Sequence, residues 1–310
     1  MTRWLLFALL LLAGSATAFE THDLDWVDER RERPVPVRLY WPEADRPVPL
    51  VVFSHGIGGS RRGYSYLGEY FASQGVASLH VQHVGSDRSL WSGNPLTLLG
   101  RLQDAATDRE AFERVKDLSF ALDEVLAHAG FGARIDRARI AAAGHSYGAN
   151  TVMLATGASV ERDGRRIQAR DPRIKVAVLL SAPPFYGEAD PAKILRPVTL
   201  PTLHITATED TIRIPGFYSP VSDRLAVFEA VGSRVKALAV FEGGSHSIFT
   251  NRAGTGGAEL NPQVKAATRE LALAFLRRVF DGKGETLERW PLSHAPLLAR
   301  WVGPATAVAR

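Results

Sequence analysis

The stretch Gly144-His145-Ser146-Tyr147-Gly148 decides the fold of this chain. Its G-x-S-x-G spacing is that of a sharp turn from a strand into a helix, with the serine in a strained conformation at the apex. Residues 139–143 before the turn (Arg-Ile-Ala-Ala-Ala) are typical of a buried strand, and residues 149–155 after it are typical of a helix. This setting predicts that Ser146 is a nucleophile.

Two further polar residues follow strand-like stretches downstream of the turn. Residues 201–207 are mostly apolar and lead to Asp210, and residues 235–241 lead into a glycine-rich loop that carries His246. A residue just past a strand end lies on the face where open α/β sheets bind ligands. We therefore expect His246 to act as the base for Ser146 and Asp210 to orient the imidazole.

The acid has alternatives in the sequence. Glu209 immediately precedes Asp210, and Glu188 follows the preceding predicted strand. Either carboxylate could orient a histidine, or could equally be a solvated surface charge. A simple turn residue is the alternative interpretation of Asp210.

A glycine-rich loop follows an earlier buried strand. Residues 50–54 (Leu-Val-Val-Phe-Ser) lead into residues 55–59 (His-Gly-Ile-Gly-Gly). Such a loop can direct backbone N–H groups at a developing oxyanion. We expect the amides of Ile57 and of Tyr147, which follows the nucleophile, to form the oxyanion hole. The amides of Gly56 and Gly58 are the alternatives to Ile57.

The segment of residues 83–106 has no clear periodicity and contains glycine, proline and asparagine. A connection of that length inside a compact domain is usually functional, and this one begins at a strand end on the same face as Ser146. We expect it to form a cap or a cleft wall. The aromatic residues predicted to line an apolar substrate pocket are Trp91, Phe185, Phe217 and Tyr218.

Strand and helix patterns alternate along the whole chain. The predicted strands are residues 35–41, near an edge because of their prolines, 50–54, 76–81, 139–143, 174–180, 203–207 and 236–241. The predicted helices are residues 64–73, 107–128, 149–155 and a final helix at 271–280 that begins as early as Pro262. Apolar strands alternating with helices predict a doubly wound, mostly parallel α/β sheet with helices on both faces.

The N-terminus has the pattern of a signal peptide. Arg3 precedes the apolar stretch 4–12, and Ala16-Thr17-Ala18 forms an A-x-A cleavage site. The stretch is short for a bilayer span, although an uncleaved anchor is an alternative. The sequence therefore predicts a signal peptide at 1–18, a single domain at 19–310, and an exported protein, periplasmic or secreted, with no stable membrane span after cleavage.

Composition limits the classes of partner and cofactor. The net charge is only +4 and the basic residues are dispersed, which argues against a nucleic-acid partner. The chain has no cysteine, so it has neither disulfides nor a thiolate nucleophile. The histidines lack zinc-binding spacing and no dinucleotide fingerprint follows a strand, so we expect no metal and no cofactor. The sequence leaves the oligomeric state open.

Taken together, these motifs resemble the α/β-hydrolase superfamily, in which the nucleophile, acid and histidine follow this chain order. Within it, the chain is similar to the serine-type, dienelactone-hydrolase-like group that includes platelet-activating-factor acetylhydrolases. True dienelactone hydrolases use a cysteine where this chain has Ser146. The resemblance spans roughly residues 35–280 and rests on residues 53–60, 144–148, 206–210 and 244–246.

The resemblance implies a serine hydrolase that cleaves carboxylic esters, with a small-molecule ester as its partner. An amidase or peptidase with the same three residues is the first alternative. A non-catalytic binding protein of the same fold is the second, and the occupied positions Ser146, Asp210 and His246 argue against it.

Overall fold

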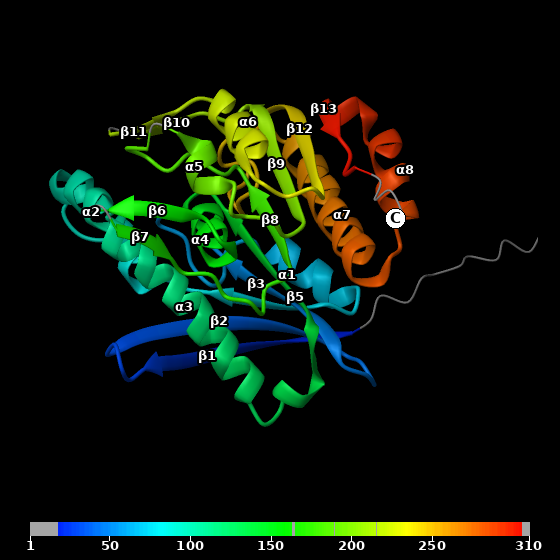
Figure 1. The fold of residues 1–310 in the computed structure, drawn as a ribbon, viewed down its shortest axis with the longest axis horizontal. Coiled ribbons are helices and arrows are strands. Elements are labelled where there is room, and N and C mark those ends of the chain that lie inside the picture. The colour runs from blue at the N-terminus through cyan, green and yellow to red at the C-terminus, as the bar shows by residue number, and fades with distance from the viewer. Residues whose placement is uncertain (1–17, 163–164, 189, 215, 306–310) are drawn as a thin grey trace, which may run out of the picture.

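The computed structural model describes residues 18–162, 165–188, 190–214 and 216–305. Their main feature is a nine-stranded sheet with the strand order β1-β2-β4-β3-β5-β8-β9-β12-β13 (Figure 1). Neighbouring strands in its centre are parallel, which confirms the predicted mostly parallel α/β-hydrolase fold. The central strands are β4 (Ala77–Val81), β3 (Val48–Ser54), β5 (Ile135–His145), β8 (Val176–Leu180), β9 (Thr202–Glu209) and β12 (Lys236–Ser245).

Helices cover both faces of this sheet, because the side chains of each strand alternate between the two faces. In β3, Leu50 and Val52 join one hydrophobic cluster, whereas Val51 and Phe53 join the other. The first cluster is completed by α3 (Asp108–Ala127), α4 (Tyr147–Thr156), α5 (Pro191–Leu195) and α6 (Val221–Ala230). The second is completed by α1 (Ser65–Ser73), α7 (Leu260–Asp281) and α8 (Glu285–Ser293).

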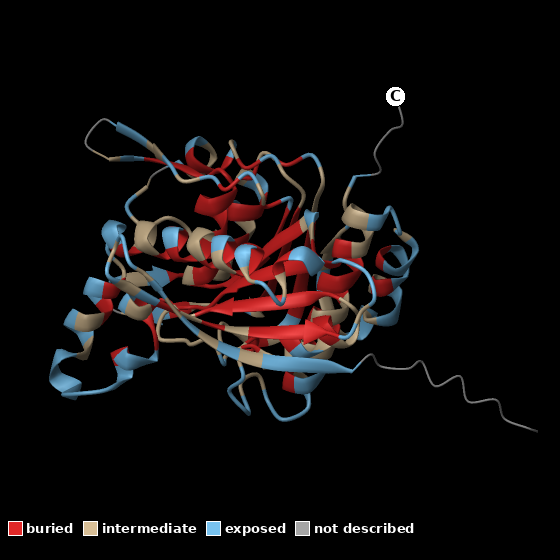
Figure 2. Cartoon of the chain, turned by 90° about the horizontal axis from the view of Figure 1, so that it is seen from below, coloured by how far each residue is buried: buried red, intermediate tan, exposed pale blue. Residues whose placement is uncertain are grey.

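The outer strands are antiparallel to their neighbours. They are β1 (Phe19–Asp28) and β2 (Arg33–Pro42) on one side and β13 (Leu298–Val302) on the other. Figure 2 shows buried central strands beside an outer strand that is largely exposed. As predicted, residues 35–41 lie near an edge of the sheet, since they belong to β2 and only β1 lies outside it. The prolines are tolerated because only residues 37–40 of β2 pair with strands on both sides.

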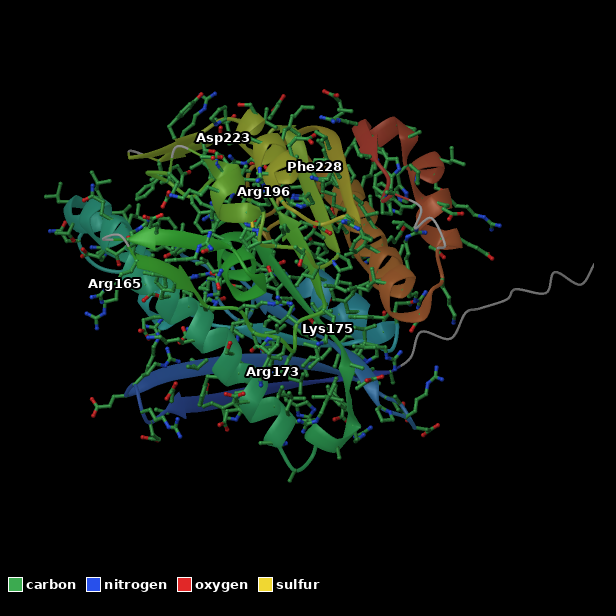
Figure 3. The ribbon with its side chains drawn as sticks, in the orientation of Figure 1. Arg165, Arg173, Lys175, Arg196, Asp223 and Phe228 are labelled. Atoms are coloured by element: carbon green, nitrogen blue, oxygen red, sulfur yellow. The ribbon has the colours of Figure 1, made fainter. Side chains whose placement is uncertain are left out.

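The parallel arrangement brings the C-terminal ends of the central strands to the same edge of the sheet. β5 ends at His145, β9 at Glu209 and β12 at Ser245, so the residues that follow these strands meet there. Arg173 and Lys175 precede β8 and therefore mark the opposite end of the strands, in the lower half of Figure 3.

Several short elements differ from the sequence prediction. Residues 83–106, expected to be irregular, contain the 3₁₀ turns η1 (Val84–Ser86), η2 (Arg88–Trp91) and η3 (Pro95–Thr97) and the helix α2 (Leu98–Ala105). The helix α7 is not the last element, because α8 and β13 follow it. Two hairpins, of β6 (Ser159–Arg162) with β7 (Arg165–Gln168) and β10 (Ile212–Ile214) with β11 (Phe217–Ser219), were not predicted. Strands of three or four residues are too short to produce a recognisable alternation.

Candidate active site

Ser146 lies at the turn between β5 and α4, in a strained backbone conformation with φ 55° and ψ −124°. Its backbone N–H donates to the carbonyl oxygen of Leu180 at 2.9 Å, which ties the turn to β8. Only glycine fits at the positions two residues before and two residues after Ser146. A Cβ at Gly144 would lie 2.3 Å from the carbonyl oxygen of Gly148, and a Cβ at Gly148 would lie 1.9 Å from that of Ser54.

Three side chains at this edge of the sheet form a continuous chain of hydrogen bonds. Nε2 of His246 lies 2.8 Å from Oγ of Ser146, and Nδ1 lies 2.7 Å from Oδ1 of Asp210. Asp210 is fully buried, whereas 18% of the His246 side chain is exposed. The arrangement can transfer the Ser146 proton to an imidazole whose other nitrogen is held by a carboxylate.

The surroundings of Asp210 favour its ionised form. Burial by itself raises the pKa of this carboxyl group, but the hydrogen bond and charge of His246 and the charge of Arg224 outweigh burial, so its pKa lies well below the usual range. Thr206 Oγ1 donates to its Oδ2 at 2.6 Å, and Arg224 Nε lies 3.4 Å from Oδ1. The carboxylate thus remains charged at neutral pH.

The two alternative acids lie elsewhere in the described part of the chain. Glu209 is exposed, and its backbone carbonyl accepts from the amide of Thr211. Glu188 forms an ion pair with Arg162. Neither carboxylate bonds to His246 among the described residues, so the geometry favours Asp210 over both.

His145 links Tyr64 to the backbone of His246, the candidate base. Its Nδ1 lies 2.8 Å from the hydroxyl of Tyr64, and its Nε2 lies 2.9 Å from the backbone carbonyl oxygen of His246. Burial, followed by the charge of His246, lowers the pKa of His145 to about 3. His145 is therefore neutral at physiological pH and holds the His246 backbone without competing for the Ser146 proton.

The backbone N–H groups of Tyr147, Ile57 and Gly56, which lie beside Ser146, have no partner in the described residues. Tyr147 is the first residue of α4, so its amide is one of those that a helix leaves unpaired. Ile57 likewise donates no hydrogen bond within the described ranges, whereas the amide of Gly58 donates to Ser86 at 2.8 Å. The alternative donor Gly58 is therefore occupied. Gly56 brings the loop against the serine, since a Cβ there would lie 3.3 Å from Cβ of Ser146.

A cavity of about 420 Å³ opens next to Ser146 and His246. Of the four predicted pocket residues, Trp91, Phe185 and Phe217 line it, whereas Tyr218 does not. Phe217 and Tyr218 are neighbours on β11, so their side chains point to opposite faces, and Tyr218 is 67% exposed. Further apolar lining comes from Ile57, Leu102, Leu154, Ile212 and Ile214.

Trp91 is anchored beside the predicted oxyanion hole. Its Nε1 donates to the carbonyl oxygen of Gly58 at 2.8 Å, and its ring occupies the space that a Cβ at Gly58 would need. The segment of residues 83–106 thus contacts the loop that carries Ile57 and contributes to the cavity wall.

Sequence reasoning missed the charged side chains that support these groups. Arg224 beside Asp210 lies on α6, a helix that the pattern did not predict. Arg114 is fully buried on α3. The sequence pattern could have indicated Arg114, because this residue lies one helical turn before Leu118 on the apolar face of the helix, where charged residues are uncommon.

Other binding features are absent from the described ranges. No cluster of three or more histidine, aspartate or glutamate side chains is placed there to hold a metal ion. None of the helices in that part of the chain combines the length and apolarity needed to cross a bilayer. The predicted signal peptide lies outside the described residues, apart from Ala18.

Comparison with known proteins identifies similar sequences. The family model for platelet-activating factor acetylhydrolase, isoform II, matches residues 32–93, which include the loop with Ile57. The platelet-activating factor acetylhydrolase of Cavia porcellus is 26% identical over 207 residues, covering 57% of this chain and 45% of the relative. The match thus spans less than half the length of that relative. The predicted similarity to the platelet-activating-factor acetylhydrolase-like group of α/β-hydrolases is confirmed.

Proposed function

We propose that this chain is a serine esterase that cleaves carboxylic esters through an acyl-enzyme on Ser146. The observation that carries the proposal is the hydrogen-bonded chain from Ser146 through His246 to Asp210, at 2.8 and 2.7 Å, beside an apolar cavity. The similarity to an acetylhydrolase supports the same class of reaction.

The first half of the reaction forms the acyl-enzyme. Oγ of Ser146 bonds to the ester carbonyl carbon while Nε2 of His246 takes its proton. The carbonyl oxygen becomes an oxyanion, which the amides of Ile57 and Tyr147 stabilise. The tetrahedral intermediate then collapses, and the leaving alkoxide takes the proton from His246 and departs as the alcohol.

The second half releases the acid. A water molecule gives a proton to His246 and attacks the acyl carbon, which again places negative charge on the oxygen held by Ile57 and Tyr147. Collapse of this intermediate breaks the bond to Oγ, and the proton on His246 returns to Ser146. The buried carboxylate of Asp210 stabilises the imidazolium in both halves.

The size and lining of the cavity favour short-chain, soluble esters over emulsified triglycerides. Trp91, Phe185 and Phe217 form an apolar wall around about 420 Å³. Such a volume accommodates a small substrate. The relative's name, an acetylhydrolase, refers to a short acyl group.

Export is part of the proposal and rests on residues 1–18 of the sequence. The A-x-A site predicts a mature chain that begins at Phe19. N-terminal sequencing of the protein from the extracytoplasmic fraction should find Phe19 first. Recovery of the chain in membranes with residues 4–12 still attached would support the anchor instead.

The test of the esterase proposal uses a fluorophosphonate probe and a matched pair of substrates. The protein should bind the probe covalently and hydrolyse p-nitrophenyl acetate at least 100-fold faster than p-nitroacetanilide, since the amide is the less reactive substrate. Ser146→Ala should abolish both labelling and turnover. Ser60→Ala is the control, because Ser60 also lines the cavity but lies outside the hydrogen-bonded chain.

Three outcomes would contradict the proposal. Absence of both labelling and turnover would favour the binding protein, and faster cleavage of the anilide would favour the amidase. Equal loss in Ser60→Ala would move the reaction away from Ser146.

A further inference from the structure

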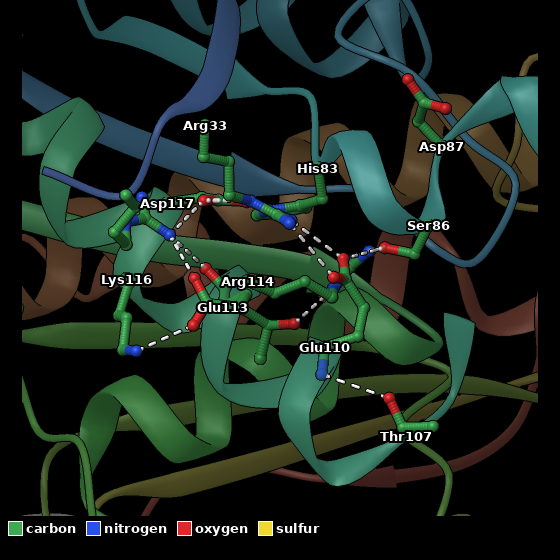
Figure 4. A network of polar contacts seen from close by, with 12 residues as sticks. Arg33, His83, Ser86, Asp87, Thr107, Glu110, Glu113, Arg114, Lys116 and Asp117 are labelled. Atoms are coloured by element: carbon green, nitrogen blue, oxygen red, sulfur yellow. Dashed lines mark hydrogen bonds and ion pairs between the residues drawn. The ribbon is translucent and has the colours of Figure 1, made fainter. Parts of the chain in front are cut away.

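Arg114 is a fully buried arginine on α3 that takes no direct part in the candidate active site, and Figure 4 shows it among its polar neighbours. Its guanidinium donates from Nε to Thr151 Oγ1 at 2.9 Å and from Nη1 to Ser86 Oγ at 2.7 Å. The Nη2 group donates to Ser54 Oγ at 3.2 Å and to the carbonyl oxygen of His55. A single side chain on α3 therefore bonds to β3, η1 and α4.

The charge of Arg114 has no direct acidic partner among the described residues. The nearby carboxylates of Glu110 and Asp117 both form ion pairs with Arg33 (Figure 4). Asp117 also pairs with Arg31. The hydroxyl of Ser86 separates Glu110 from Arg114, because it accepts from Arg114 and donates to Glu110 at 3.0 Å. Burial lowers the pKa of Arg114 only to about 10, so the group is charged at neutral pH. Burying such a charge is costly, and stability alone would favour an apolar residue.

The contacts of Arg114 lie on both sides of the first oxyanion donor. The carbonyl of His55 belongs to the backbone just before Gly56 and Ile57. Ser86, which Arg114 holds through its hydroxyl, accepts the amide of Gly58 through its backbone oxygen. Arg114 thus restrains the backbone before and after Ile57.

The same guanidinium contacts the second donor. It lies over the ring of Tyr147, 4.4 Å from the ring centroid. Thr151, which accepts from Arg114, donates in turn to the backbone oxygen of Tyr147 at 3.0 Å. The first turn of α4 is therefore linked to the Ile57 loop through one rigid, planar group.

We propose that Arg114 is a positioning residue that fixes the amides of Ile57 and Tyr147 relative to each other and so assembles the oxyanion hole. The inference rests on the proposed esterase function. An oxyanion hole stabilises the transition state more than the substrate, so a loosened hole lowers kcat and leaves KM nearly unchanged. A displacement on the order of 1 Å can cost about 100-fold in rate.

The test compares Arg114→Lys and Arg114→Met with the unmodified protein on p-nitrophenyl acetate. Lysine keeps the charge but cannot make the four divergent contacts, so both variants should lose about 10- to 100-fold in kcat, with KM within threefold. Ser146→Ala and wild-type turnover are measured first. Wild-type activity that does not depend on Ser146 contradicts the proposed function itself.

A pair of ketones separates positioning from mere stabilisation of the fold. An alkyl trifluoromethyl ketone forms a tetrahedral adduct with Ser146 that carries an oxyanion, whereas the matching methyl ketone binds without one. In the variants, the Ki of the trifluoromethyl ketone should rise by the same factor by which kcat/KM falls. The Kd of the methyl ketone should stay unchanged.

Two more variants keep the test decisive if the Arg114 variants do not fold. Thr151→Val removes only one bridging hydroxyl and should lower kcat about 3- to 10-fold. The Ki of the trifluoromethyl ketone should rise by a matching factor, while the Kd of the methyl ketone stays unchanged. Arg173→Gln is the control, since it breaks ion pairs with Asp171 and Asp123 at the opposite end of the strands (Figure 3). It should lower Tm without changing kcat or the ratio of the trifluoromethyl ketone Ki to the methyl ketone Kd.

Three results would overturn the inference while leaving the esterase proposal intact. One is wild-type kcat in folded Arg114 variants. Another is a parallel loss of affinity for both ketones, which indicates a general loss of structure. If the Arg114 variants do not fold, wild-type kcat and an unchanged ketone ratio in Thr151→Val overturn it equally.

Discussion

The candidate catalytic groups and the wall of the cavity come from different kinds of structure. Ser146, Asp210 and His246 each follow directly from a central parallel strand, and the hydrogen-bonded sheet holds these positions. The wall comes largely from connections, namely residues 83–106 and the β10–β11 hairpin. It is also more accessible, since Trp91 is 47% exposed whereas Asp210 is fully buried.

This difference separates two properties of the proposed enzyme. Changes at the strand ends alter groups that act on the ester bond itself, so they should lower kcat for every ester by a similar factor. Changes in the connections alter contacts with the acyl or alcohol part, so they should change the ratios of kcat/KM among esters. The four predictions below test this separation, from the largest expected effect to the smallest.

Ser146→Ala should give the largest effect, a loss on the order of 10⁵- to 10⁶-fold in kcat, because no other group in the hydrogen-bonded chain can form the acyl-enzyme. The loss should be the same for acetyl, butyryl and hexanoyl esters. Single-turnover kinetics of these three p-nitrophenyl esters measure it. A loss that depends strongly on acyl-chain length would contradict the assignment of reactivity to the strand ends and of selectivity to the cavity wall.

Asp210→Asn should lower kcat by about 10⁴-fold, because an amide cannot hold the imidazole in the required tautomer or stabilise its cation. Glu209→Gln is the matched control and should change kcat less than threefold, since Glu209 is exposed and does not bond to His246 in the described structure. Steady-state kinetics of both purified variants provide the comparison. The reverse ranking would assign the acid to Glu209.

Acid should destabilise the folded chain through its buried histidines. Burial lowers the pKa of His80 to about 4 and of His145 and His204 to about 3, and it lowers that of His55 strongly. Below about pH 6.5 the unfolded chain binds protons that the folded chain does not. The free energy of unfolding therefore decreases as the pH is lowered. Each histidine should contribute up to about 1.4 kcal/mol per pH unit.

Urea unfolding between pH 7 and 5 measures this loss. Carboxylates such as Asp23, whose pKa is lowered to about 2 by its hydrogen bond with Arg38, lose their contribution only below about pH 4 and do not interfere in this window. A free energy of unfolding that is constant from pH 7 to 5 would show that the buried histidines accept protons in the folded state.

Trp91→Ala should give the smallest effect, a change of about 3- to 30-fold in the ratio of kcat/KM between hexanoyl and acetyl esters. The indole lines the cavity and donates to the Gly58 carbonyl. Its loss therefore enlarges the cavity without removing a proposed catalytic group. Tyr218→Ala is the control of similar size and should leave the ratio unchanged. Equal effects of Trp91→Ala across the series would show that residues 83–106 do not select the acyl chain.

Much of the site was predictable from the sequence because its signals are local. The strand–turn–helix around Ser146 shows as an apolar run, two glycines and a helical pattern within about 15 residues. Asp210 and His246 each follow a recognisable strand, and a parallel sheet brings such positions to one edge. The order of the three residues along the chain thus carried information about their proximity.

The sequence could not decide features that depend on distant contacts. Tyr218 and Phe217 look alike in the sequence, and only the pairing of β11 with β10 determines which side chain faces the cavity. The strand β1 has mixed polarity and exists because β2 offers a complete row of pairing positions. Intrinsic strand propensity is weak compared with such pairing.

Arg114 shows the same limit most clearly. The sequence places a charge on the apolar face of a helix, which is a local anomaly without an assigned partner. Only the folded chain brings Ser54, Ser86 and Thr151, which are up to 97 positions apart, around one guanidinium. Local order along the chain thus determined the candidate reacting groups of this protein. The tertiary structure decided which side chains hold these groups in place. The contacts of a buried charge come from residues far apart in the sequence, which a local pattern does not show.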